Sequence, residues 1–235
     1  HLENTDALSL LKDTPSNSID LILTDPPYII SKDSGFKSVG KKGVARLGVS
    51  TDYGEWDRQS APDHESMMLA LFKEYYRVLK TGGTVICWYD LWKLQSLAAY
   101  AENAKLKQPR LIEWVKTNPV PINSKRNYLT NSREVALTFV KGGKPTVHSQ
   151  YDNGVYSAPI HRDGGKRIHP TQKPLGISQE LIEKHSNVGD TILDTFAGSA
   201  THLVAALMCG RNAIGCELDK THFNNASKRL EKYCE

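Results

Sequence analysis

The sequence predicts an α/β fold in which one mostly parallel sheet is covered by helices on both faces. An apolar run at 19–24 ends abruptly at Pro26 and Pro27, which cannot donate to a strand ladder, so it is typical of a buried parallel strand that stops at a rigid loop. A second short apolar run, at 190–194, leads into a tight turn at Gly198 and then into a helix, which lets a ligand approach the backbone closely. In open sheets of this kind, ligands bind at the carboxyl ends of the strands.

A third observation makes the predicted sheet Rossmann-like. The segment 212–216 ends at Glu217, which lies 23 positions after Asp194. An acidic residue at the end of the second strand of a Rossmann-like unit accepts hydrogen bonds from ribose hydroxyls. Glycine turns and strand-end acids are common separately, but the ordered pair indicates a ligand that contains ribose.

In chain order, seven segments are expected to be strands and five to be helices. The expected strands are 2–5, 19–24, 84–89, 110–116, 134–140, 190–194 and 212–216, and the expected helices are 7–12, 67–80, 91–104, 175–185 and 200–208. Thr81-Gly82-Gly83 is expected to stop the helix that precedes it. The 235 residues suit one domain, 1–235, because sheets of this kind use that length for a single core.

Composition limits the class of protein. The formal charge of the chain is +4, and the basic residues gather in segments expected to be loops. Such a distribution suits binding to a polyanion, although it is also typical of an ordinary solvated surface. The four cysteines form no C-x-x-C pair, so we expect reduced thiols and no metal. No apolar run approaches the roughly 18 residues of a membrane span, and no signal peptide is recognised, so a soluble cytoplasmic protein without a membrane partner is expected. The chain begins at His1 rather than methionine, so we expect its true start to be missing.

The tetrapeptide Asp25-Pro26-Pro27-Tyr28 stands at the end of the first buried strand. An acidic acceptor, a Pro26 carbonyl that no helix or sheet uses, and the Tyr28 ring suit a planar group that carries an amine, because the ring can stack on it and the oxygens can accept its N–H groups. The alternative is an ordinary turn aspartate at a strand-to-turn junction.

These motifs resemble those of the amino-methyltransferases that modify adenine N6 or cytosine N4 in DNA with S-adenosylmethionine. Besides the tetrapeptide, Asp-Thr-Phe-Ala-Gly-Ser at 194–199 looks like the cofactor loop of that family, and His-Pro-Thr-Gln-Lys-Pro at 169–174 looks like the segment before it. Because the tetrapeptide comes first and the glycine loop last, the order is that of the beta class, a circular permutation of the class I methyltransferase fold. The resemblance spans nearly the whole chain.

The resemblance implies two sets of site residues. The catalytic set is Asp25, Pro26, Pro27 and Tyr28. The cofactor-binding set is Asp6, Ala7, Asp25, Thr171, Lys173, Asp194, Phe196, Ala197, Gly198, Ser199 and Glu217. Within it, Asp6 accepts from the adenine amine of the cofactor, although locally it reads as a helix N-cap, and Thr171 and Lys173 are candidates for the cofactor carboxylate.

The resemblance also implies a mechanism. A target adenine is flipped out of DNA and stacked on Tyr28, while Asp25 and the Pro26 carbonyl accept from its exocyclic amine, so transfer is an in-line displacement without a metal. Asp rather than Ser before Pro-Pro-Tyr favours adenine. The alternatives are cytosine N4 methylation, an RNA substrate, or a DNA-binding homologue with weakened catalysis. Two residues depart from the usual loop of the family, Thr195 where proline is common and Ala200 where a second glycine is common, and Ala200 motivates the last alternative.

DNA, double-stranded or single-stranded, is the expected partner, with a homodimer as an option. The segment 29–57 is expected to be a flexible DNA-contacting loop and 141–168 a short target-recognition segment. The expected DNA contacts are Lys37, Lys41, Lys42, Arg46, Asn118, Lys125, Arg126, Lys166 and Arg167. A prokaryotic or phage-encoded enzyme of restriction-modification type fits these expectations.

Overall fold

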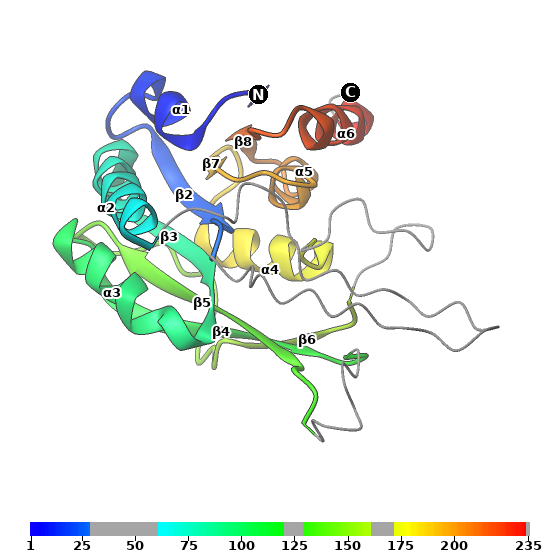
Figure 1. Cartoon of the computed structure of the whole chain (residues 1–235). Helices are drawn as coiled ribbons and strands as arrows, with labels where there is room; N and C mark the ends of the chain where they lie inside the picture. The colour runs from blue at the N-terminus through cyan, green and yellow to red at the C-terminus, as the bar shows by residue number, and fades with distance from the viewer. Residues whose placement is uncertain (29–60, 120–128, 161–171, 234–235) are drawn as a thin grey trace.

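The computed structural model of the chain describes residues 1–28, 61–119, 129–160 and 172–233 (Figure 1). The loop 29–57 lies outside these residues. So do the predicted site residues Lys37, Lys41, Lys42, Arg46, Lys125, Arg126, Lys166, Arg167 and Thr171.

The described residues form strands and helices that largely alternate along the chain. The strands are β1 (Leu2–Glu3), β2 (Ile19–Thr24), β3 (Leu79–Tyr89), β4 (Lys107–Lys116), β5 (Arg133–Val140), β6 (Val155–Ala158), β7 (Thr191–Asp194) and β8 (Asn212–Cys216). The α-helices are α1 (Ala7–Asp13), α2 (Ala61–Val78), α3 (Leu94–Asn103), α4 (Leu175–His185), α5 (Thr201–Met208) and α6 (Lys220–Leu230). Two 3-10 turns, η2 (Leu91–Lys93) and η3 (Glu231–Tyr233), precede α3 and follow α6.

These strands form one sheet in the order β1-β8-β7-β2-β3-β5-β4-β6. Neighbouring strands are parallel except where β5 pairs with β3 and with β4, so β5 alone is reversed. The prediction of a mostly parallel sheet is therefore confirmed. The strands that end at Thr24 and Asp194 are neighbours, with Leu21 opposite Ile192.

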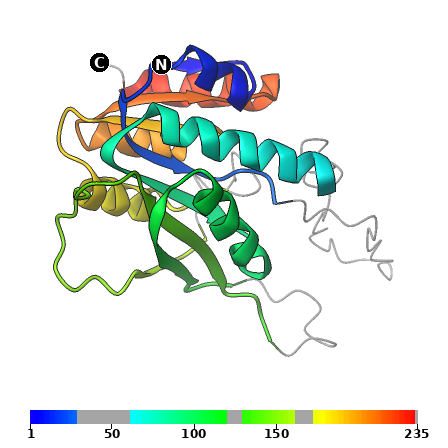
Figure 2. The ribbon, with the colours of Figure 1, turned by 90° about the vertical axis from the view of Figure 1, so that its left-hand side faces the viewer.

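Helices cover both faces of the sheet, and the alternation of side chains along each strand explains why. In β2, Ile22 faces the core formed with α1, α2 and α3, whereas Leu21 and Leu23 face the core formed with α4, α5 and α6. Figure 1 shows the two groups of helices on opposite sides of the sheet, and Figure 2 shows α2 and α3 in front of it. Burial of alternate residues on both faces makes β2 a central strand, which fixes its carboxyl end in place.

The sheet has eight strands among the described residues rather than the seven expected. The additional strand, β6, is short and lies at the sheet edge, where it pairs only with β4. The glycines after α2 do not act as a helix stop: α2 ends at Val78, and Thr81, Gly82 and Gly83 already belong to β3. The helix α6 was not expected from the sequence. Its N-cap, Asp219, accepts from the backbone N–H of His222 at 2.8 Å.

The reversal of β5 decides which connections lie on the same side of the sheet as Asp25, where the parallel strands have their carboxyl ends. Because β5 begins on that side, the connection 117–132 leaves and re-enters the sheet there. Because β5 ends on the opposite side, the segment after it starts there: Lys141 N–H donates to the Gly83 carbonyl at 3.0 Å, and His148 N–H donates to the Lys184 carbonyl at 2.9 Å. From Val155 the chain runs back along β6 toward the side with Asp25. The recognition role of 141–168 stays a prediction.

Candidate active site

Asp25 and Asp194 lie at the carboxyl ends of two adjacent strands. Asp194 is the last residue of β7, and Asp25 follows the last residue of β2. Thr24 joins the two strand ends, because its hydroxyl donates to Asp194 Oδ1 at 2.9 Å. A ligand at one aspartate is therefore next to a ligand at the other.

The loop from Asp194 to Ala200 is shaped by its own backbone hydrogen bonds. Phe196 N–H donates to Asp194 Oδ1 at 3.1 Å, and Ala197 N–H donates to the Cys216 carbonyl at 2.9 Å. Gly198 has φ +51°, and its N–H donates to Glu217 Oε2 at 2.8 Å. The loop thus turns back on the end of β8, which brings Glu217 beside Gly198.

Ala200 holds the left-handed conformation that glycine usually provides. It is the N-cap of α5, with φ 58° and ψ 28°, and its side chain is fully buried. A non-glycine residue there costs about 1 to 2 kcal/mol. The loop nevertheless closes, since Ala200 N–H donates to the Ala197 carbonyl at 2.6 Å. The alanine therefore strains the turn but does not prevent it.

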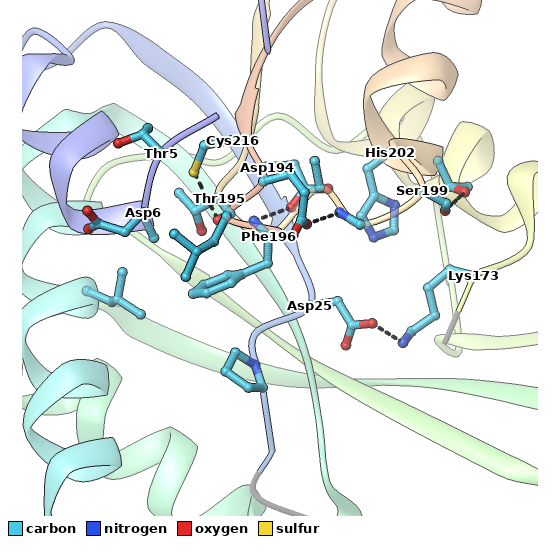
Figure 3. Close-up of a pocket in the computed structure, with 18 of the residues that line it drawn as sticks. Thr5, Asp6, Asp25, Lys173, Asp194, Thr195, Phe196, Ser199, His202 and Cys216 are labelled. Atoms are coloured by element: carbon cyan, nitrogen blue, oxygen red, sulfur yellow. Dashed lines mark hydrogen bonds and ion pairs between the residues drawn. The ribbon is translucent and has the colours of Figure 1, made fainter. Parts of the chain in front are cut away.

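A cavity of about 210 Å³ opens between the ends of β2, β7 and β8 and the start of α1 (Figure 3). Its wall includes the predicted cofactor residues that the structure describes: Asp6, Ala7, Asp25, Lys173, Asp194, Phe196, Ala197, Gly198, Ser199 and Glu217. Pro27 also lines it, as do Thr195, His202, Met67 and Leu71, which the sequence interpretation did not include. The structure thus brings together residues that are far apart along the chain.

Carboxylates dominate the charge of this cavity. Asp6 caps α1 by accepting from Ser9 N–H at 3.0 Å, and the Ser9 hydroxyl is the main group that lowers the pKa of Asp6. Burial raises the pKa of Asp194 to about 7, against the hydrogen bonds from Phe196 N–H and the Thr24 hydroxyl. Asp194 Oδ2 is buried and has no hydrogen-bond partner among the described residues. An orphaned carboxylate oxygen in a cavity wall calls for an N–H donor from a ligand.

The basic residues of the cavity wall do not neutralise these acids. His202 is neutral, because burial lowers its pKa to about 3, and its Nδ1 is 2.9 Å from the Ser178 hydroxyl. Lys173 is charged but bound on the side of Asp25 (Figure 3). The part of the cavity between Asp6, Asp194 and Glu217 therefore suits a cationic ligand.

The side chain of Asp25 is enclosed by two donors. The Tyr28 hydroxyl donates to Oδ1, and the ammonium of Lys173 donates to Oδ2. Burial raises the pKa of Asp25, while Lys173 and Tyr28 oppose the rise. Tyr28 is held in turn, since its ring meets that of Tyr89 edge to face at 5.3 Å and its carbonyl accepts from the ammonium of Lys93. The tetrapeptide is thus fixed by side chains from other elements.

Lys173 belongs to a second group of charges that sequence interpretation missed. Its Nζ lies 3.2 Å from Glu134 Oε2, and Glu134 Oε1 lies 2.7 Å from Lys116 Nζ. Burial acts to raise the pKa of Glu134, but the two lysines outweigh it and hold that pKa below its usual range. Glu134 stands near the start of β5, and only the reversed direction of β5 brings it to Asp25. The sequence carries no signal of that direction.

The remaining predicted residues are placed as follows. Pro26 is buried, and Tyr28 is partly buried beside Asp25. Asn118 is exposed after β4, where its Oδ1 accepts from Ile160 N–H at 2.6 Å. Nothing in the described part of the chain groups histidine, cysteine and acidic side chains into a metal site, and no described helix is long and apolar enough to cross a membrane.

A cavity at a switch in strand order, with an Asp-Pro-Pro-Tyr corner beside it, is the arrangement expected of the Rossmann-like amino-methyltransferases that the sequence resembles. A family model described as DNA methylase, whose name covers N6 and N4 enzymes, matches residues 19–228. The chain belongs to this family, which confirms the resemblance found in its sequence.

Relatives and solved structures agree. The chain is 34% identical over 250 residues to the type II methyltransferase M2.DpnII of Streptococcus pneumoniae, covering 98% of this chain and 89% of that protein. It is similar to the crystal structure of the M1.HpyAVI–SAM complex, with a TM-score of 0.73, 26% identity and 98% of each chain covered. The PvuII DNA methyltransferase, which is cytosine-N4-specific, has a TM-score of 0.76 at 15% identity, with 99% of this chain and 89% of that chain covered. This last likeness concerns the fold alone.

Proposed function

We propose that this protein transfers the methyl group of S-adenosylmethionine to N6 of an adenine that has been flipped out of DNA. The observation that carries the proposal is the position of Asp25, which lines the same cavity as Asp194 and Glu217. A group that can hold an exocyclic amine and a wall that suits a cationic nucleoside therefore meet at one place. The M1.HpyAVI structure, whose chain is bound to SAM, supports the choice of cofactor.

The residues present fit that cofactor. Glu217 lies at the end of β8 to accept from ribose hydroxyls, and it already orders the loop through Gly198 N–H and Asp219 N–H, at 2.8 and 2.9 Å. Asp194 Oδ2 offers an unused acceptor for an ammonium group. Asp6, the N-cap of α1, would accept from the adenine amine of the cofactor. Phe196 and Leu71 supply apolar wall. The cofactor, when bound, supplies an electrophilic methyl group on a sulfonium sulfur.

The chain's own groups then act on the target amine. Asp25 and the carbonyl of Pro26 accept hydrogen bonds from the two N–H groups of the target amine. These hydrogen bonds orient the nitrogen lone pair toward the cavity and stabilise the positive charge that develops on nitrogen. Tyr28 stacks on the base, in a position maintained by Tyr89 and Lys93. Most of the rate enhancement in this proposal comes from positioning and local electrostatics.

Adenine is proposed over cytosine because aspartate rather than serine precedes Pro-Pro-Tyr. The alternative of a catalytically weakened homologue was motivated by Ala200, but the loop of Ala200 is formed and its hydrogen bonds are made. We further propose that the basic residues of 29–57 contact DNA phosphates, that the protein acts in the cytoplasm of a prokaryotic cell, and that a homodimer is one form in which it acts.

Incubation with mixed double-stranded DNA and S-adenosylmethionine, followed by digestion to nucleosides and mass spectrometry, tests the function. N6-methyladenine is the expected product. N4-methylcytosine would instead support the cytosine alternative, and methylated RNA nucleosides in a parallel incubation would support an RNA substrate. Cofactor binding by calorimetry without any methylated product would support a binding homologue and contradict the proposal.

A further inference from the structure

A chain of paired charges beside the catalytic tetrapeptide, formed by Lys173, Glu134 and Lys116, has no part in the mechanism above. Lys173 is bonded to Asp25 and lies 3.2 Å from Glu134, which in turn lies 2.7 Å from Lys116. The side chain of Lys173 is only 3% exposed. Two carboxylates and two ammonium groups balance one another, so the members can exchange partners without leaving a buried charge uncompensated.

Both carboxylate oxygens of Asp25 already accept hydrogen bonds in the arrangement observed. Its Oδ1 accepts from the Tyr28 hydroxyl and its Oδ2 from the ammonium of Lys173. A target amine that binds Asp25 therefore competes with one of these donors for the carboxylate lone pairs. Lys173 is the donor with a second carboxylate within reach, because Glu134 Oε2 is 3.2 Å from its Nζ while Oε1 of the same carboxylate holds Lys116. A small side-chain movement therefore transfers the ammonium.

Electrostatics favours the same movement. The amine nitrogen becomes positively charged as it takes the methyl group, and an ammonium on the same carboxylate would repel it. Held by Glu134, the ammonium of Lys173 is compensated by a carboxylate of its own. The rings of Tyr28 and Trp88, whose centroids are 5.9 and 5.5 Å from Nζ, favour a cation in this region of the site.

We propose that Lys173 is a placeholder for the target amine and that Glu134 is the positioning residue that receives it. The ammonium of Lys173 occupies Asp25 while no base is bound, and it moves to Glu134 when the exocyclic amine binds Asp25. This proposal rests on the proposed function, since it describes how the same site admits its target.

The groups that face Asp25 come from several elements. They are Tyr28 of the tetrapeptide, Cys87 of β3, Glu134 of β5, Lys173 before α4 and Asp194 of β7. Lys173 opposes the rise that burial causes in the pKa of Asp25, whereas Glu134 adds to that rise. Removing the charge of Lys173 and removing the charge of Glu134 should therefore move the Asp25 pKa in opposite directions.

Single-turnover methylation across pH tests the proposal with three variants. Lys173→Met leaves Asp25 without its cation, so the acidic limb of the rate profile should move to higher pH. The rate at a fixed pH on that limb should fall about tenfold for each pH unit that the limb moves. Glu134→Gln leaves Lys173 without its second carboxylate, so the rate should fall about tenfold or more at every pH, and the limb should not move up. Cofactor affinity should be unchanged in Glu134→Gln, because Glu134 does not line the cavity.

Glu113→Gln is the matched control. Glu113 of β4 pairs with Arg133 at 3.0 Å, and the variant should behave as wild type.

The double variant gives the sharpest outcome. If Glu134 acts through Lys173, adding Glu134→Gln to Lys173→Met should cause no further loss of rate. Multiplicative losses, a wild-type rate for Glu134→Gln, or limbs that move in the same direction would overturn the proposal. If Glu134→Gln does not fold, Glu134→Asp, whose shorter carboxylate cannot reach both lysines, should show the same slow rate.

A readout that does not depend on methylation separates this proposal from the proposed function. In protein labelled with ¹³C at aspartate carboxyls, with Asp25 assigned from Asp25→Asn, the Asp25 titration should move up in Lys173→Met and down in Glu134→Gln. Those opposite shifts would support the linkage even if the wild-type chain left DNA unmethylated, a result that would overturn only the function. Titrations that do not move would overturn the placeholder role.

Discussion

The site has two halves: a cofactor half around Asp194 and Glu217, proposed to bind S-adenosylmethionine, and a target half around Asp25 and Glu134, proposed to bind the base. In the cofactor half, the two carboxylates accept hydrogen bonds from hydroxyl and backbone N–H groups, and neither forms an ion pair with any described residue. In the target half, the two carboxylates are paired with Lys173 and Lys116. The halves are adjacent, yet one is left negative and the other is neutral. Each matches the charge of what it is proposed to bind, because the cofactor carries a sulfonium and an ammonium group while a nucleobase is uncharged.

The difference has an energetic reason. Burial of an uncompensated carboxylate is unfavourable, as the pKa of about 7 at Asp194 records, so a cationic ligand gains affinity by supplying the missing charge. A neutral base supplies no charge, and its pocket therefore needs counter-ions of its own. Variants that remove one carboxylate at a time should thus have different effects in the two halves.

The largest effect is expected for Asp25→Ala. It removes an acceptor that matters most as positive charge develops on the amine, so single-turnover methyl transfer should fall by several orders of magnitude, on the order of 4 kcal/mol or more in the barrier. Affinity for S-adenosylmethionine, measured by calorimetry, should be nearly unchanged. Asp20→Asn, in the same strand but at its other end and paired with Lys80 at 2.8 Å, is the control. A near wild-type rate in Asp25→Ala would refute the catalytic assignment.

Asp194→Asn should stabilise the protein without ligand while weakening cofactor binding. The folded-state pKa of Asp194 is raised to about 7, above its unfolded value, so its penalty is absent below about pH 4, grows as pH rises, and is complete above 7. At pH 8 the free energy of unfolding of the variant should therefore exceed that of wild type by about 2 to 4 kcal/mol, which raises its unfolding temperature. At pH 4 the two proteins should unfold alike.

The pH dependence of binding gives the second half of that test. Wild-type affinity for S-adenosylmethionine should increase as pH rises through about 7, because the cation favours the ionised form of Asp194. Asp194→Asn should lose this dependence. Equal pH profiles of the two proteins in calorimetry would mean that Asp194 does not face the cation.

Glu217→Ala should have a smaller effect, confined to the cofactor. Loss of a paired acceptor for ribose hydroxyls costs on the order of 1 to 3 kcal/mol of binding free energy. The loop also loses the contact with Gly198 N–H, which adds to the loss. Saturating S-adenosylmethionine should restore most of the single-turnover rate. Unchanged affinity in calorimetry would remove Glu217 from the site.

Ala200→Gly should have the smallest effect. Glycine relieves about 1 to 2 kcal/mol of left-handed strain, but it loses a buried methyl group, about 0.8 kcal/mol, and gains freedom in the unfolded chain, about 0.5 to 1 kcal/mol. These contributions nearly cancel, so thermal unfolding should shift by only a few degrees. Ala200→Val is the contrast, because a β-branched side chain at φ 58° should be strongly destabilising. A large gain of cofactor affinity in Ala200→Gly would revive the weakened-homologue alternative.

Much of the fold was predictable because it depends on local patterns. The bounds 19–24 and 212–216 agree with β2 and β8, since a continuous apolar run between turn residues leaves little choice of structure. The strand β6 was missed because its four residues alternate in burial inside a polar, glycine-containing segment, and only pairing with β4 makes them a strand. The strand β3 begins five residues before its predicted start at 84, at Leu79, because the pairing of Leu79 with Ile19 extends it across two glycines.

The site was predictable to the extent that a motif lies within one segment. Asp25, Asp194 and Gly198 each belong to a short motif, and the resemblance of these motifs to one family indicated that they form one site. Glu134 and Lys116 belong to no motif, and their position depends on the direction of β5, which follows from how the whole chain is connected. Lys173 was predicted beside the cofactor carboxylate. It lines that cavity, but its ammonium binds Asp25, and its role toward the cofactor stays a prediction.

The pairing of β4 with β5 has a consequence for how such a protein can diversify. Residues 116 and 132 are joined by a 2.7 Å hydrogen bond from Lys116 N–H to the Ser132 carbonyl, so the two ends of the connection between them are held together by the sheet itself. Lengthening a connection whose ends are already fixed costs little, about 0.6 kcal/mol for each doubling. The connection 117–132 is thus a place where a foreign segment can be grafted beside Asp25 and Glu134 while the residues proposed to hold the methyl donor keep their register.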